Sequence, residues 1–165
     1  MIIYEEIFRE FQKKQIKYVI VGGIALNLLG SLRSTADMDI LVEMSDNNLK
    51  KALAILKKHG YRVKSHIDPM GILDPKTRQE WIKKKHMKAL NFYKDGMLKE
   101  VDVVIGSPVT FEKAEKTAVK IKTGNITLPV ISIDNLIKMK KSAGRAVDKL
   151  DIEELKKIKA FRRKL

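Results

Sequence analysis

Apolar and polar positions repeat along this chain with two periods, and each change of period marks a new element. Near the start, apolar side chains recur every three to four positions, which predicts an amphipathic helix over residues 2–14. A continuous apolar run predicts a short buried strand over residues 18–21. Residues 24–29 return to a helical pattern that ends at Gly30, and an alternating pattern over residues 37–42 predicts a second strand.

The rest of the chain shows the same mixture of helical and extended patterns. Ser45 is positioned to cap another amphipathic helix, which Gly60 follows. Two helices close the chain, and the last one is expected to bury an apolar side that comprises Ile152, Leu155, Ile158 and Phe161. The other predicted segments are a strand over 61–63, a loop over 68–75, a hairpin of 86–93 with 98–105, a helix over 108–115 and a hairpin of 118–122 with 126–131.

Together these elements predict an α/β (α+β) fold, with a mixed β-sheet, flanking helices and a C-terminal helical segment. We expect residues 1–131 to form the core and residues 132–165 to pack on it, within one structural domain. The chain has no cysteine, which excludes disulfides and thiolate metal sites. No apolar run approaches the roughly 18 residues that span a membrane. No basic leader segment opens the chain, so we expect a cytoplasmic protein without a membrane partner.

Two carboxylates placed two positions apart carry the most specific chemistry in the chain. Asp37 and Asp39 flank Met38 at the start of the predicted strand, so both side chains are expected on one face, about 7 Å apart along the strand. Neighbouring carboxylates repel each other and lose solvation, and a fold retains them where a cation compensates the charge. Mg²⁺ meets that need, because it takes hard oxygen ligands and leaves positions for substrate phosphates.

A glycine pair lies between the first predicted strand and the helix that follows it. Gly22 and Gly23 would let backbone N–H groups and the positive end of a helix dipole approach a phosphate. The lysine and hydroxyl residue of a Walker loop do not follow, and no third glycine completes a dinucleotide fingerprint.

This ordered set of residues resembles the nucleotidyltransferase superfamily, which has the polymerase-beta-like fold. It is most similar to the small bacterial branch, which includes minimal nucleotidyltransferases and the nucleotidyltransferase toxins of toxin–antitoxin pairs. In that family a glycine pair opens a helix, an Asp-x-Asp motif follows, and a third carboxylate lies in a later strand. Here thirteen residues separate Gly23 from Asp37, and Asp102 matches the third carboxylate. The resemblance covers about residues 16–155, without a counterpart for residues 64–84, and many active members carry serine where this chain has Gly23.

The resemblance implies transfer of a nucleoside monophosphate from an NTP to a hydroxyl acceptor, with release of pyrophosphate. The implied catalytic residues, which would hold two Mg²⁺ ions (or Mn²⁺), are Asp37, Asp39 and Asp102, and Asp102 is also the expected general base. The implied nucleotide-binding residues are Gly22, Gly23, Arg33, Lys138, Lys141, Arg145 and Asp148. Among these, Arg145 is expected to clamp the triphosphate, whereas Arg33 is expected to contact phosphate or to pair with a carboxylate.

The charge of the chain indicates an anionic substrate or partner. Thirty-four Lys and Arg against twenty Asp and Glu give a formal net charge of +14. The excess concentrates in the run 83–85 and from Lys138 onward, where eleven basic residues accompany four acidic ones. Solvated lysine-rich helices produce the same count without any partner, and the aromatic content of 6% offers no stacking platform for single strands.

The sequence leaves the acceptor open. An RNA such as a tRNA 3′ end, a protein hydroxyl and a small molecule such as an aminoglycoside all remain, and the charge favours RNA. Two non-enzymatic alternatives also remain. One is a basic nucleic-acid-binding module with a vestigial site, and the other is a toxin–antitoxin component that acts by binding an antitoxin or another protein.

Overall fold

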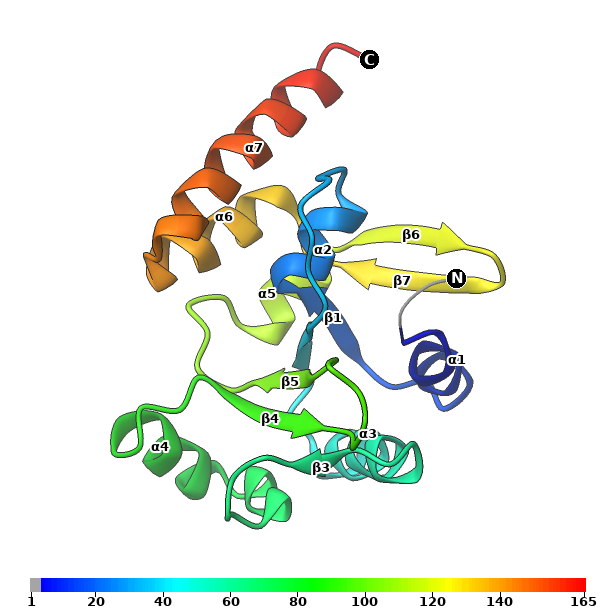
Figure 1. Ribbon diagram of the computed structural model, residues 1–165, viewed down its shortest axis with the longest axis vertical. Coiled ribbons are helices and arrows are strands. Elements are labelled where there is room, and N and C mark those ends of the chain that lie inside the picture. Colours follow the sequence, from blue (N-terminus) through cyan, green and yellow to red (C-terminus); the bar gives the residue numbers. More distant parts are fainter. Residues whose placement is uncertain (1–3) are drawn as a thin grey trace.

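The computed structural model describes residues 4–165 and places their strands in one seven-stranded mixed sheet (Figure 1). The sheet order is β3-β4-β5-β2-β1-β7-β6. The strands are β1 (Tyr18–Val21), β2 (Met38–Val42), β3 (Arg62–Val63), β4 (Ala89–Tyr93), β5 (Val101–Val104), β6 (Val119–Thr123) and β7 (Ile126–Val130). The helices are α1 (Glu5–Lys13), α2 (Gly22–Leu28), α3 (Asp46–Lys58), the 3₁₀ helix η1 (Pro69–Leu73), α4 (Pro75–Lys83), α5 (Phe111–Lys116), α6 (Ile133–Ala143) and α7 (Ala146–Arg162). The predicted α/β (α+β) class, a mixed sheet with flanking helices, is confirmed.

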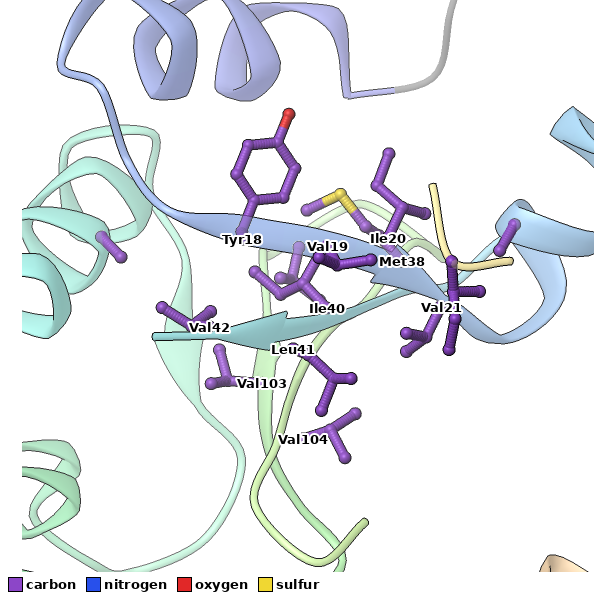
Figure 2. Packing of buried hydrophobic residues seen from close by; sticks show 14 of the residues in the cluster. Tyr18, Val19, Ile20, Val21, Met38, Ile40, Leu41, Val42, Val103 and Val104 are labelled. Atoms are coloured by element: carbon purple, nitrogen blue, oxygen red, sulfur yellow. The ribbon is translucent and has the colours of Figure 1, made fainter. Parts of the chain in front are cut away.

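The centre of the sheet is formed by β1, β2 and β5. β1 pairs antiparallel with β2, and β2 pairs parallel with β5. Figure 2 shows how apolar side chains of these strands, among them Val19, Ile40 and Val103, pack together in the core. In β2 and in β5 the second residue is the one position that is not buried, and these two residues are Asp39 and Asp102.

Helices cover this sheet and add to the same core. α1 packs against α3 and β7, and α2 packs against β1 and β2. In Figure 1, α6 and α7 lie together at the end of the molecule away from β3 and β4. Ile133, Leu136 and Leu155 of these helices are buried in the same hydrophobic cluster as the strands. The division into residues 1–131 and 132–165 stays a prediction. Between residues 4 and 165, no helix is both long enough and apolar enough to cross a membrane.

Most predicted elements are confirmed, with shifted ends. The helix predicted over residues 2–14 is α1, and residues 2 and 3 lie outside the part that the structure describes. The strand predicted over 18–21 has the bounds of β1. The helix predicted over 24–29 begins two residues earlier, at Gly22, and both predicted hairpins form.

The loop predicted over residues 68–75 is wrong. This segment forms η1 and the start of α4. Asp68 and Asp74 each cap one of these helices by accepting backbone N–H groups, and a proline follows each aspartate. Asp-Pro is a turn signal in an isolated sequence. It also begins helices, because the aspartate satisfies free N–H groups and the fixed φ of proline suits the first helical position.

Phe161 was expected on the buried side of the last helix, and this expectation is also wrong. It is 64% exposed, whereas Leu155 on the same side is fully buried. The reason is the length of α7, whose C-terminal turns extend past the sheet, so that the apolar side loses its partner there (Figure 1).

We expect the burial of Leu155 to hold α7 on the core. Leu155→Ala removes a fully buried side chain and leaves a cavity, which should lower the free energy of unfolding by about 2–5 kcal/mol. Leu150→Ala in the same helix is the matched control, because Leu150 is 72% exposed and its loss should change the stability by about 0.5 kcal/mol or less. Urea unfolding measures both variants, and equal effects would contradict this account of how α7 is attached.

Candidate active site

Asp39 and Asp102 lie beside each other on the wall of a cavity. They are direct neighbours in the register of the parallel strands β2 and β5, which lie about 4.8 Å apart. Both side chains line a cavity of about 480 Å³, whose other walls come from the start of α2, from β4 and from the facing ends of α6 and α7. Period-two alternation therefore explains their placement, because the residues on either side of each aspartate point into the core.

The charge of Asp39 is poorly compensated. Burial raises the pKa of Asp39 to about 7, and repulsion from Asp102 and then Asp37 adds to this effect. The cations of Lys140 and Arg145 act in the opposite direction without cancelling it. The charged form of this carboxyl is therefore disfavoured and would gain from a further positive charge.

Asp102 is held in a milder version of the same environment. Burial raises its pKa, a hydrogen bond from the Asn91 amide opposes the rise, and repulsion from Asp37 adds to it. Asn91 lies opposite Asp102 on β4, and its Nδ2 donates to Oδ1 of the carboxylate over 2.7 Å. This hydrogen bond fixes the orientation of Asp102 at the cavity wall.

Asp37 lies near this pair but outside the cavity. It precedes β2, it is exposed, and its Oδ1 accepts a hydrogen bond from the backbone N–H of Glu100 over 3.2 Å. Among residues 4–165, no group of three or more His, Cys, Asp or Glu side chains has the arrangement of a ready metal site. The predicted convergence of Asp37, Asp39 and Asp102 on two shared ions therefore stays a prediction.

The two glycines have different surroundings. Gly22 borders the cavity with φ +67°, and a Cβ there would lie 2.0 Å from Oδ2 of Asp39. Only glycine therefore leaves room for an aspartate at this point of β2. Gly23 packs against the next loop instead, since a Cβ there would lie 2.5 Å from Oγ1 of Thr35. The roles of both glycines in nucleotide binding stay predictions.

A buried group of charges joins α6, α7 and the loop before β2. Nζ of Lys140 lies 2.6 Å from Oδ2 of Asp151 and 3.6 Å from Oδ1 of Asp148, and all three side chains are buried. Arg145 also binds Asp148, with its Nε 2.8 Å from Oδ2, and Arg33 pairs with Asp151. Burial of Lys140, Asp148 and Asp151 is tolerated because each one has an opposite charge within hydrogen-bond distance.

The predicted nucleotide-binding residues of the C-terminal half separate into two groups. Arg145 and Asp148 line the cavity. Lys138 and Lys141 are exposed on α6, and neither belongs to the cavity lining. Arg33, from the N-terminal half, is engaged by a carboxylate of α7 rather than by Asp37 or Asp39. The contacts of these residues with nucleotide stay predictions.

Lys140 was not identified from the sequence, although it is the lysine of α6 that reaches the cavity. It follows Ile133 and Leu136 on the buried face of the helix. Their i, i+3, i+7 spacing places all three side chains on one side of the helix. The amphipathic pattern of the sequence therefore indicates that Lys140 lies on the buried face. Asn91 was also not identified, because the hairpin of β4 with β5 was predicted without the register that places Asn91 opposite Asp102.

One part of the cavity wall carries a lysine without a salt-bridge partner among residues 4–165. His86 and Lys88 line the cavity directly after the exposed run 83–85. Lys84 of this run lies 3.6 Å from Glu80, whereas its two neighbours and Lys88 have no acidic partner within 4 Å in the part of the chain that the structure describes. This rim of the cavity is therefore suited to an anionic group.

Comparison with known proteins agrees with the resemblance that the motifs carry. A family described as "Uncharacterised nucleotidyltransferase" matches residues 2–123. The crystal structure of the lincosamide antibiotic adenylyltransferase LnuA, lincomycin-bound, is similar with a TM-score of 0.62 at 17% identity, over 93% of this chain and 94% of that chain. The crystal structure of ANT(2″)-Ia in complex with adenylyl-2″-tobramycin has a TM-score of 0.56 at 14% identity, over 95% and 91%. At these identities the likeness concerns the fold. No curated protein matches the sequence at a significant level.

The raised pKa of Asp39 should make the stability of the metal-free protein depend on pH. The unfolded chain releases this proton near the ordinary pKa of 3.8 and the folded protein near 7. Between these values the folded state binds the extra proton, so the stability should fall as the pH rises from 4 to 7. Asp39→Asn should remove this loss of stability. Its free energy of unfolding at pH 8 should exceed that of the parent by about 2–4 kcal/mol.

Urea unfolding at pH 5 and pH 8 measures the effect. Asp46→Asn is the control, because Asp46 is exposed at the start of α3 and should leave the pH profile of the parent unchanged. A parent protein that is equally stable at both pH values would contradict the electrostatic account of Asp39.

Proposed function

Because this chain belongs to a family of nucleotidyltransferases, we propose that it transfers a nucleoside monophosphate from an NTP to a hydroxyl acceptor and releases pyrophosphate. The observation that carries this proposal is the pairing of Asp39 with Asp102 at a cavity that Lys140 and Arg145 also line. The carboxylates suit a divalent cation, and the two basic side chains suit a polyphosphate.

The donor set fits a divalent cation chemically. Asp39 and Asp102 present hard carboxylate oxygens side by side. Burial raises the pKa of both, and repulsion adds to the rise, from Asp102 at Asp39 and from Asp37 at Asp102. We propose two Mg²⁺ ions, with Mn²⁺ as a substitute, held by Asp37, Asp39 and Asp102. Bound there, the ions would offset the charge on the phosphates and favour deprotonation of the attacking hydroxyl.

Asp102 is the proposed general base. It accepts the proton of the attacking hydroxyl, whose oxygen forms a bond to the α-phosphorus of the NTP. The bond from the α-phosphorus to the bridging oxygen breaks, and its electron pair leaves with pyrophosphate. Asn91 donates to Oδ1 of Asp102, which leaves Oδ2 for the proton. The raised pKa of Asp102 makes it a better proton acceptor than an exposed aspartate.

The triphosphate is proposed to lie between the start of α2 and the facing ends of α6 and α7. Gly22 lets the chain approach it, while Lys140 and Arg145 compensate its charge. Asp148 orients the guanidinium of Arg145 through two hydrogen bonds, from Nε and Nη2. Gly23 and Arg33 would contribute indirectly, because Gly23 packs against the loop of Thr35 and Arg33 connects that loop to α7. Lys138 and Lys141 would contact parts of a ligand beyond the cavity.

RNA is the proposed acceptor. His86 and Lys88 line the cavity, and the exposed lysine run 83–85 directly precedes them in the chain. A phosphate backbone is the polyanion that such a lysine cluster binds. The related structures contain the antibiotic lincomycin and an adenylylated tobramycin. An amine-rich aminoglycoside would need carboxylates beyond the metal-binding pair. The third cavity-lining carboxylate, Asp148, is already neutralised by Lys140 and Arg145.

We expect substitution of either cavity carboxylate to stop the transfer. Asp39→Asn should abolish it while the fold persists, and Asp102→Asn should lower it by about 10²–10⁴-fold through loss of the base. Labelled NTPs incubated with total cell RNA, with protein extract or with small-molecule acceptors give the readout, and Asp46→Asn is the control that should retain activity. Transfer at the parent rate by Asp39→Asn would contradict the mechanism.

If RNA is the acceptor, the affinity for RNA should depend on salt, and lysines near one edge of the sheet should produce most of this dependence. For the parent protein, log K against log[salt] should fall by about 0.7 for each neutralised phosphate of a single strand. Replacement of Lys83, Lys85 and Lys88 by glutamine should flatten this slope by about 2. The matched control replaces Lys116, Lys120 and Lys122, which are exposed at the opposite end of the sheet order, on β6 and just before it.

Filter binding of RNA at several salt concentrations measures both triple variants. The control variant should keep the slope of the parent. Equal flattening by both variants would indicate unspecific attraction by net charge. A slope near zero for a parent protein that still transfers nucleotides would favour a protein or small-molecule acceptor.

A further inference from the structure

We infer that Tyr4 is a positioning residue for the carboxylate site, because its hydroxyl joins the two chain segments from which the aspartates extend. The inference rests on the proposed function, since it gives Tyr4 a part in holding the proposed metal-binding carboxylates. Tyr4 itself lies outside the cavity lining and belongs to neither the glycine pair nor the Asp-x-Asp motif.

The hydroxyl of Tyr4 bridges two backbone carbonyls, which share its single proton. Its oxygen lies 2.6 Å from the carbonyl oxygen of Ala36 and 2.8 Å from that of Glu100. Ala36 directly precedes Asp37, and Glu100 comes two residues before Asp102. We call this pair of contacts the Tyr4 bridge. It connects the entry of β2 to the entry of β5, and these two strands meet only when distant parts of the chain pair.

Two further hydrogen bonds surround the Tyr4 bridge. The backbone N–H of Met38 donates to the carbonyl oxygen of Glu100 over 2.9 Å, and the N–H of Glu100 donates to Oδ1 of Asp37 over 3.2 Å. The carboxylate of Asp37 is therefore oriented by the same backbone residue that Tyr4 contacts. If the entries of β2 and β5 separated, Asp37 would lose this orientation, and the register that places Asp39 beside Asp102 would loosen at its end.

The bridge is held from the side of α1. Tyr4 is the N-cap residue of α1 with φ +68°, and the helix is anchored by the buried side chains Ile7, Phe8 and Phe11. The ring of Tyr4 packs against the hydrophobic core. Burial raises the pKa of its hydroxyl, with a smaller contribution from the charge of Asp37. The hydroxyl therefore stays protonated and remains a donor at neutral pH.

Tyr4→Phe tests the inference, because it deletes one oxygen atom and keeps the ring. Tyr18→Phe is the matched control. Tyr18 is buried in β1, and its hydroxyl makes no hydrogen bond to any residue from 4 to 165. Both variants lose the same atom from a tyrosine that packs in the core, and only one of them loses the bridge.

The first measurement needs no metal and no activity. Amide hydrogen exchange of Met38 and Glu100 reports whether the entries of β2 and β5 stay together. Exchange should become about tenfold faster in Tyr4→Phe, and it should be unchanged in Tyr18→Phe. Equal exchange in the parent and in Tyr4→Phe would overturn the inference, whatever the enzyme does.

The second measurement is Mn²⁺ binding, followed by the electron paramagnetic resonance of the free ion with and without NTP. Loss of a residue that supports metal ligands typically weakens binding by about tenfold or more, so Tyr4→Phe should bind Mn²⁺ about tenfold more weakly than the parent and than Tyr18→Phe. Faster exchange with unchanged Mn²⁺ affinity would overturn the positioning role and leave the proposed function intact. A parent that binds no Mn²⁺ in either condition would overturn the metal-dependent function and this inference with it, even where the exchange result holds.

Discussion

Repulsion between two carboxylates on adjacent parallel strands is the interaction to which the rest of the site is adjusted. Asp39 and Asp102 share a register position and a cavity, so the charged form of each one depends on what its surroundings supply. Gly22 gives Asp39 the space that it needs, and Asn91 holds Asp102 in one orientation. The strands themselves are fixed by apolar neighbours on both sides of each aspartate, so the pair cannot move apart to relieve the strain.

The C-terminal helices contribute charged side chains to this site. Lys140 faces the cavity and is at the same time held by Asp148 and Asp151 inside the protein. Removal of one member of such a buried group leaves an uncompensated charge, which costs more than the pair contributes. The ion pair of Arg33 with Asp151 connects α7 to the loop before β2, and Asp151 also binds Lys140 of α6. Loss of the Arg33 contact would therefore shift Lys140 and change the electrostatic environment of Asp39.

Local patterns were sufficient to predict the order of the strands along the chain, the two hairpins and the strand that Asp37 and Asp39 begin. Period-two alternation places Asp37 and Asp39 on a strand, whereas Asp102 was selected because the resemblance requires a third carboxylate within an apolar strand. The segment after Asp68 was not predicted, because Asp-Pro begins a helix or a turn with the same residues and the choice depends on Trp81 and Ile72 reaching the core. The Lys140 group could not be predicted in full, since its partners come from three elements. The sequence shows that a lysine lies on an apolar helix face. Only the fold shows which carboxylates pair with it.

The parallel pairing of β2 with β5 has a consequence for how the protein acquires its site. Asp39 and Asp102 are separated by α3, β3, η1, α4 and β4, so they cannot meet until this whole stretch has folded back on itself. Pairings between distant segments form late and slow the folding of a chain, because the entropy of closing a long loop is lost before the contact stabilises it. During synthesis, β2 leaves the ribosome long before β5 does. The nascent chain therefore carries its first two aspartates before their partner strand exists, and Asp39 meets Asp102 only in a late stage of folding.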